Sequence, residues 1–181
     1  MQTLGDTEIK TWLRDRGLTA ILDHSSESSN QLYLQFRAPV AHRHTEAFIR
    51  CLLEMTMPCA NALIHISDWP LYQPSEMLTI HALRATCGEN RRLIDSPWHV
   101  IPSTEAELGI SLFSLTVSYQ WNAWLYLQNG ATTLYNWEGE LFDFWTTDRE
   151  TYTKLANLVR DFNLATTTQS ESPAAASRNI R

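Results

Sequence analysis

Apolar residues recur at helical spacing in five stretches of the chain. In one of them the apolar side chains occupy positions i, i+3, i+4 and i+7 of a helix: Phe48, Cys51, Leu52 and Met55. The same periodicity, together with capping residues such as Asp6 and Asp148, predicts the other helices. The predicted helices cover residues 7–16, 45–57, 75–87 and 104 to about 118, and a last helix follows Asp148.

Alternation of apolar and polar residues predicts the strands. Four short strands are expected between the helices: residues 18–23, 31–38, 61–67 and 98–101. The dipeptide Asn129-Gly130 stands between two β-rich runs, which is a strong signal for a tight hairpin. A further strand follows at residues 140–146. The chain from about 121 to 146 is therefore predicted to form an antiparallel meander.

Residues 104–127 contain two competing periodicities. Leu108, Leu112 and Leu115 fit a helix, whereas every odd position from 113 to 127 is apolar, as expected for a strand. A single strand of that length would be unusually long. We therefore predict a helix to about residue 118 and a strand from residue 121.

Together these elements predict one domain of the α+β class, covering residues 1–165. Its expected architecture is a mixed sheet with the C-terminal antiparallel meander (about 121–146) and helices packed on one or both faces. Residues 166–181 are rich in Thr, Ser, Ala and Pro and have no apolar periodicity. Because such a composition buries little apolar surface, we expect a disordered C-terminal tail there.

Composition and charge narrow the classes of partner. Twenty acidic and fourteen basic residues give a net charge of −6, and the only basic doublet is Arg91-Arg92. Nucleic-acid-binding proteins usually present a basic surface to the phosphates, so a nucleic-acid partner is disfavoured. The apolar runs are too short to span a bilayer, and residues 1–10 lack the pattern of a secretion signal. We expect a cytoplasmic protein that does not contact a membrane.

The sequence offers little support for a cofactor or a metal ion. The cysteines Cys51, Cys59 and Cys87 form no C-x-x-C pair, and the six glycines form no phosphate-binding motif. His42 and His44 are spaced as on a strand, but they precede a helix and lack a matching carboxylate or thiol pattern. We therefore expect no cofactor and no metal site, and the sequence identifies no catalytic residue.

One candidate binding site combines two segments of the chain. The first segment follows the strand of residues 61–67, at the kind of sheet end where open α/β folds bind ligands. The second, residues 84–99, is rich in charged side chains and ends in Trp-His. The candidate ligand- or partner-binding residues are Asp68, Trp69, Arg84, Glu89, Arg91, Trp98 and His99. Two indoles and guanidinium groups in one pocket would suit a carboxylate. The competing interpretation is a capped loop followed by charges that pair with one another at the surface.

The second candidate is the meander, whose strands carry aromatic side chains at both parities. The aromatic residues are Trp124, Tyr126, Tyr135, Trp137, Phe142, Phe144 and Trp145, and the carboxylates among them are Glu138, Glu140 and Asp143. If helices cover both faces of the sheet, these aromatic side chains belong to the core. Otherwise an aromatic and acidic face is left for a partner chain, which is typical of protein interaction surfaces.

The function that these features favour is a non-catalytic protein-binding module of a regulatory or immunity/inhibitor-like kind, with a protein as partner. The alternative is a small-ligand-binding domain or an enzyme that uses the Asp, Glu, Arg and His cluster around residues 68 and 89–99. That alternative requires Asp68 and His99 to line one pocket. A third hypothesis is a homo-oligomer joined through the meander. The sequence does not determine the oligomeric state, so this hypothesis stays open.

Overall fold

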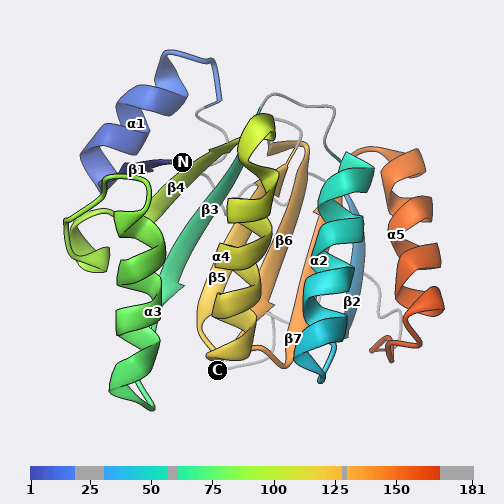
Figure 1. Ribbon diagram of the computed structural model, residues 1–181. Coiled ribbons are helices and arrows are strands. Elements are labelled where there is room, and N and C mark those ends of the chain that lie inside the picture. The colour runs from blue at the N-terminus through green and yellow to red at the C-terminus, as the bar shows by residue number, and fades with distance from the viewer. Residues whose placement is uncertain (19–30, 57–60, 128–129, 168–181) are drawn as a thin grey trace, which may run out of the picture.

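An antiparallel sheet of seven strands lies at the centre of the described part of the protein (Figure 1). The computed structural model describes residues 1–18, 31–56, 61–127 and 130–167. The strand order is β1-β4-β3-β5-β6-β7-β2. The strands are β1 (Gln2–Leu4), β2 (Leu32–Arg37), β3 (Asn61–Asp68), β4 (Trp98–Pro102), β5 (Asn122–Leu127), β6 (Thr132–Trp137) and β7 (Leu141–Thr146).

Within the described ranges, four helices cover one face of this sheet and a fifth packs on the other face. The helices are α1 (Asp6–Arg14), α2 (His42–Thr56), α3 (Pro74–Ala85), α4 (Ala106–Ser118) and α5 (Arg149–Asp161). Figure 1 shows α2, α4 and α5 side by side in front of the strands. On the opposite face, Ile9 and Leu13 of α1 join Leu63 and Val100 in a separate apolar cluster. The described residues therefore form the predicted single-domain α+β fold.

Side-chain alternation along the strands separates the two faces of the meander. Leu125, Leu134 and Phe144 stand opposite one another on β5, β6 and β7, and all three are fully buried beneath the helices. Tyr135 and Asp143, the neighbours of two of these residues along their strands, pair on the other face. The predicted meander at about 121–146 is confirmed, and its two parities of aromatic residues lie in different environments.

The competing periodicities of residues 104–127 resolve as predicted. α4 ends at Ser118, and β5 begins at Asn122. Between them Gln120 adopts a φ of 58°, the left-handed conformation that commonly ends a helix. Thr104 and Glu107 have the spacing of a capping box, which the sequence predicts for the start of this helix. The box is not formed, because a 3₁₀ turn at residues 103–105 precedes α4.

Two local features fix the chain at the β6–β7 turn and at the start of α5. Asp148 caps α5 as predicted, since its carboxylate accepts hydrogen bonds from the backbone N–H groups of Glu150 and Thr151. Gly139 turns the chain between β6 and β7 with a φ of 70°. A Cβ atom at this position would lie 2.3 Å from the carbonyl oxygen of Val117. Glycine is therefore required by both the backbone conformation and the close contact with α4.

The prediction of a mixed sheet is wrong, because every described strand pair is antiparallel. Interspersed helices and strands suggested parallel crossovers. After α3, however, residues 86–97 turn the chain once more, so that β4 enters opposite His65 and runs antiparallel to β3. The helix and the loop together reverse the chain, whereas a simple β-α-β crossover would have made the strands parallel.

Several element boundaries also differ from the prediction. β1 was not predicted, because three residues are too few to display an alternation. The residue that caps α1 is Gly5 and not Asp6, and the Glu8 carboxylate accepts the Gly5 N–H at 2.6 Å. α2 begins at His42, three residues before the predicted start, because its polar first turn contributes no apolar periodicity.

Two predicted features fall wholly or mainly outside the described residues. These are the strand at residues 18–23, of which only residue 18 is described, and Asn129 of the hairpin turn. The expected tail is described for its first two residues alone. Thr166 forms an isolated antiparallel bridge with Phe36 of β2. Disorder from residue 168 onward stays a prediction.

Candidate functional site

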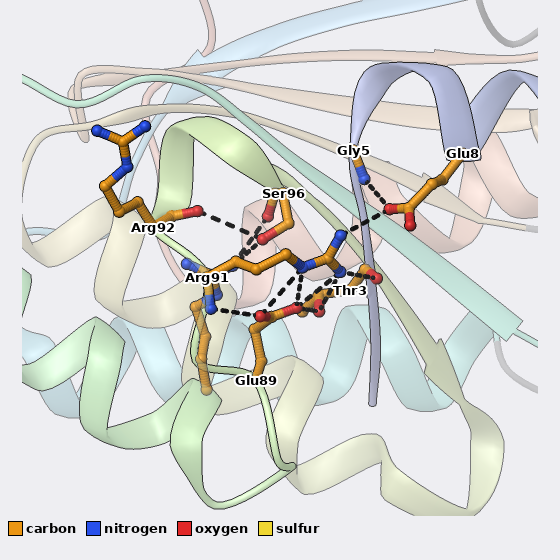
Figure 2. A network of polar contacts seen from close by, with 8 residues as sticks. Thr3, Gly5, Glu8, Glu89, Arg91, Arg92 and Ser96 are labelled. Atoms are coloured by element: carbon orange, nitrogen blue, oxygen red, sulfur yellow. Dashed lines mark hydrogen bonds and ion pairs between the residues drawn. The ribbon is translucent and has the colours of Figure 1, made fainter.

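Arg91, a residue of the first candidate site, is held by a network that joins the loop of residues 86–97 to β1 and α1 (Figure 2). Its Nε and Nη2 atoms donate to the carboxylate of Glu89 at 3.0 and 2.8 Å. Its Nη1 donates to Glu8 at 2.8 Å, and Nη2 also donates to the carbonyl of Thr3 at 2.9 Å. All three guanidinium nitrogens are therefore bonded within the chain.

Glu89 is the buried partner in this network. Its side chain is only 8% exposed, and it also accepts a hydrogen bond from the Thr3 hydroxyl. Burial raises the pKa of Glu89, but hydrogen bonds from Arg91 and Thr3 outweigh burial and bring the pKa down to about 2. The charged pair thus fastens the N-terminal strand and helix to the sheet. It leaves little capacity to bind an external carboxylate.

Stability should depend on pH through Glu89. Its pKa of about 2 in the folded protein lies below the ordinary glutamate value of 4.5. The stabilisation is therefore complete above about pH 5 and is lost as the pH falls toward 2. We expect Glu89→Gln to be less stable than wild type at pH 6, and this difference to shrink by about 1 kcal/mol at pH 3.5. Urea unfolding of both proteins at the two pH values measures it, and an unchanged difference would contradict the assignment.

Arg84 and His99 lie in the interior. Nη2 of Arg84 donates to the Ser96 carbonyl at 3.1 Å and to the Ser96 hydroxyl. Burial lowers the pKa of Arg84. Burial first, and then the nearby charge of Arg84, lower the pKa of His99 to about 3, while carbonyl groups of Ile64 and Pro97 oppose this shift. His99 is fully buried, so its imidazole is neutral at physiological pH and is enclosed by protein.

The remaining residues of the first candidate site are dispersed. Trp98 points to the α1 side of the sheet, where it stacks on His65 at 3.8 Å between ring centroids and donates its Nε1 to Asp6 at 3.0 Å. Trp69 packs against the core on the helix-covered side. Asp68 is exposed at the end of β3. The two indoles thus belong to different clusters. Arg84 lies within electrostatic reach of Glu89 and Arg91, and its own charge acts on His99.

The second candidate, the meander, covers the sheet surface opposite α2–α5 with a continuous row of aromatic side chains, of which Tyr126 and Tyr135 are buried and Trp137 is exposed. We call this surface the aromatic face. It consists of Tyr33, Trp124, Tyr126, Tyr135, Trp137, Asp143 and Trp145, which share one parity on β2, β5, β6 and β7. Phe142 and Phe144, which the sequence grouped with them, point to the helix-covered face and are fully buried.

Ring contacts run across the aromatic face from strand to strand. Tyr33 and Trp145 lie 5.5 Å apart between centroids, and Trp145 and Trp124 lie 6.0 Å apart. Trp124 continues to Tyr135 at 4.2 Å, and Tyr135 meets Trp137 edge-on at 4.6 Å. Three of these four distances fall in the range of favourable aromatic pairs, which contribute about 0.5–1.5 kcal/mol each, and the tilted Trp124–Tyr135 pair is slightly closer. The surface is therefore a preformed platform of rings in mutual contact.

Asp143 lies in the middle of this platform. Its Oδ1 accepts hydrogen bonds from the Tyr33 hydroxyl at 2.5 Å and from Gln35 Nε2 at 2.7 Å, and its Oδ2 accepts one from Trp137 Nε1. Burial and the hydrogen bond to Asp143 raise the pKa of Tyr33, so that the phenol stays protonated and donates. A carboxylate has about four lone-pair positions. Donors from the described residues occupy three of these positions and leave one on Oδ2.

Coverage by helices differs along this side of the sheet. The α1 cluster extends over β1, β4 and β3 and reaches Tyr126 and Trp124 on β5. None of the described helices packs on the part formed by β6, β7 and β2 on this face. Trp137 is 47% exposed there, and Tyr33 and Trp145 are half-buried. Among the described residues, helices therefore cover both faces of the sheet only where α1 packs, over β1, β4, β3 and part of β5.

The sequence did not reveal the contribution of β2 to this surface. Tyr33 and Gln35 lie more than 100 residues from Asp143 in the chain, and they reach it because β2 pairs with β7. Their alternation with Leu34 and Phe36 was a signal for a two-faced strand, but alternation does not specify the partner strand.

Comparison of the chain with protein families, curated proteins and solved structures finds no match. Among the described residues, no three His, Cys, Asp or Glu side chains gather closely enough to hold a metal ion. The helices of the same part of the chain are all too short or too polar to cross a membrane. The geometry of the site is therefore the basis for a functional proposal.

Proposed function

We propose that this chain is a non-catalytic protein-binding module of a regulatory or inhibitor-like kind that binds its partner through the aromatic face. The supporting observation is Trp137, which is 47% exposed at the rim of a platform that also contains Asp143. An exposed tryptophan beside the half-buried Tyr33 and Trp145 is supportive, because tryptophan and tyrosine are enriched among the residues that dominate the affinity of protein interfaces.

The alternative, a ligand-binding domain or enzyme that uses residues 68 and 89–99, has less support. His99 is enclosed and has a pKa of about 3, which is far from the value that suits a general acid or base at neutral pH. Arg91 and Glu89 bind each other. Asp68 is exposed at the end of β3, whereas His99 is fully buried, so the required common pocket lacks support.

Partner binding should depend on Trp137. Truncation of an anchoring tryptophan commonly removes 2 kcal/mol or more of binding free energy, about a thirtyfold loss of affinity. We expect the tagged wild-type protein to retain a stoichiometric partner from its native lysate, and Trp137→Ala to lose it. The purified partner should then bind wild type at a 1:1 ratio by calorimetry, with a Kd that rises at least tenfold in Trp137→Ala.

A matched control is Leu78→Ala on α3, which also removes an exposed apolar side chain but on the helix-covered side. This variant should bind the partner like wild type. Equal binding by Trp137→Ala and wild type would contradict the proposal, as would a wild-type protein that retains no partner.

A further inference from the structure

Strand register places Asp143 at the centre of four aromatic side chains. Tyr135 lies directly opposite on β6, with Trp137 on the diagonal. Tyr33 lies on the diagonal across β2, and Trp145 is the next residue of this parity on β7 itself. Diagonal neighbours lie within reach of aromatic side chains, and the hydrogen bonds from Tyr33 and Trp137 to Asp143 show that both are used. The result is a carboxylate surrounded by ring faces and edges.

In the part of the chain that the structure describes, the donors to this carboxylate are neutral groups: a phenol, an amide and an indole. Within the described residues, no Lys, Arg or His side chain forms an ion pair with Asp143. The nearest cation by register is Arg37, whose guanidinium lies 4.0 Å from Glu140 and is well exposed. A carboxylate that is 6% exposed without a cationic partner is an unusual arrangement.

Further negative charge lies beside it. Burial raises the pKa of Tyr135, a hydrogen bond with Ser67 lowers it, and the charges of Asp68, Glu138 and Asp143 raise it further. Three carboxylates therefore act on one side of the aromatic face. Together with the net charge of −6, this favours a cationic group on the partner and disfavours an acidic one.

Among cationic side chains, arginine fits this geometry best. Its planar guanidinium stacks on aromatic rings and donates hydrogen bonds in the plane at the same time. The exposed ring of Trp137 offers the stacking surface, and the remaining lone pair on Oδ2 of Asp143 offers the acceptor. A lysine ammonium is more strongly hydrated and has no planar surface with which to stack.

We propose that the partner protein places an arginine side chain of a basic segment over Asp143, stacked against Trp137. This inference rests on the proposed function, because it names the chemistry of the partner at the same surface. The guanidinium supplies the positive charge that Asp143 lacks, and the surrounding rings exclude water from the pair.

The test uses the full chain and three capped peptides: hexa-arginine, hexalysine and hexaglutamate. Binding is measured by calorimetry and by the NMR shift of the Trp137 indole N–H. We expect hexa-arginine to bind at least tenfold more tightly than hexalysine, and hexaglutamate not to bind. Trp137→Ala and Asp143→Asn should each weaken hexa-arginine binding about tenfold.

The matched control for Asp143→Asn is Glu150→Gln, which removes the same charge from an exposed position on α5 on the helix-covered side. It should leave peptide binding unchanged. Trp137→Ala alters an exposed side chain, so it remains informative if Asp143→Asn fails to fold. Equal affinity for hexa-arginine and hexalysine would overturn the proposal, as would binding that is insensitive to Trp137→Ala or absent.

Two further results separate the possible failures. If the partner needs Trp137 but hexa-arginine does not bind, the arginine inference fails and the proposed function stands. If partner binding does not need Trp137, the proposed function fails regardless of the peptides. A concentration-dependent dimer in light scattering that Trp137→Ala abolishes would assign the aromatic face to a second copy of this chain and overturn the inference.

Discussion

Truncation of Phe142 to alanine is expected to lower the free energy of unfolding by about 3–5 kcal/mol. Phe142 is fully buried and is the residue of β7 at which several elements meet. Its ring lies 5.5 Å from Phe36 of β2, 5.9 Å from Phe48 of α2 and 6.4 Å from Phe113 of α4. The large cost arises because these neighbours belong to three elements and cannot all move into the cavity. Urea unfolding at neutral pH measures the effect.

Val40→Ala serves as the control, because Val40 is 99% exposed just before α2. Its free energy of unfolding should match that of wild type within about 0.5 kcal/mol. A loss of less than 1 kcal/mol in Phe142→Ala would show that this aromatic cluster does not join the sheet to α2 and α4.

The second large effect is expected for Arg91→Ala, with a loss of about 2–3 kcal/mol at neutral pH. The variant leaves Glu89 charged and largely buried without its main partner, and such carboxylates are costly to leave unpaired. It also removes the hydrogen bonds that hold Glu8 of α1 and the carbonyl of Thr3 in β1. Amide hydrogen exchange should therefore accelerate first in β1 and α1.

The neighbouring residue provides the matched comparison. Arg92 is 77% exposed and pairs with Asp95, itself partly exposed, at 2.8 Å, and Figure 2 shows its side chain pointing away from Glu89 and Glu8. Surface pairs of this kind contribute little, so Arg92→Ala should be nearly as stable as wild type. Similar losses for the two variants would refute the structural role assigned to Arg91.

Local signals in the sequence were sufficient for most of the elements. The Asn129-Gly130 pair indicated the hairpin, and Asp148 indicated the start of α5; both elements follow from backbone preferences that act over a few residues. Likewise, the length limit on strands correctly divided residues 104–127 between α4 and β5. The first turn of α2 was missed because exposed polar residues carry no periodicity.

The candidate sites depended on contacts that local preferences do not specify. The sequence grouped Trp69, Trp98 and His99 in one pocket. In the structure, alternation along β4 sends Trp98 and His99 to opposite faces of the sheet. In the same way, Arg91 and Arg92 are adjacent and chemically identical in the sequence. Only the packing of β1 and α1 against the loop gives Arg91 a buried partner.

The aromatic face shows the same division. The sequence by itself determined that the meander carries rings at both parities with carboxylates among them, because the period of two is a property of each strand. Which parity meets the helices, and that Tyr33 and Gln35 reach Asp143, was decided only by the tertiary structure. The physical reason is that strand pairing between residues more than 100 positions apart is selected by burial of the whole apolar surface, and no local pattern records that choice.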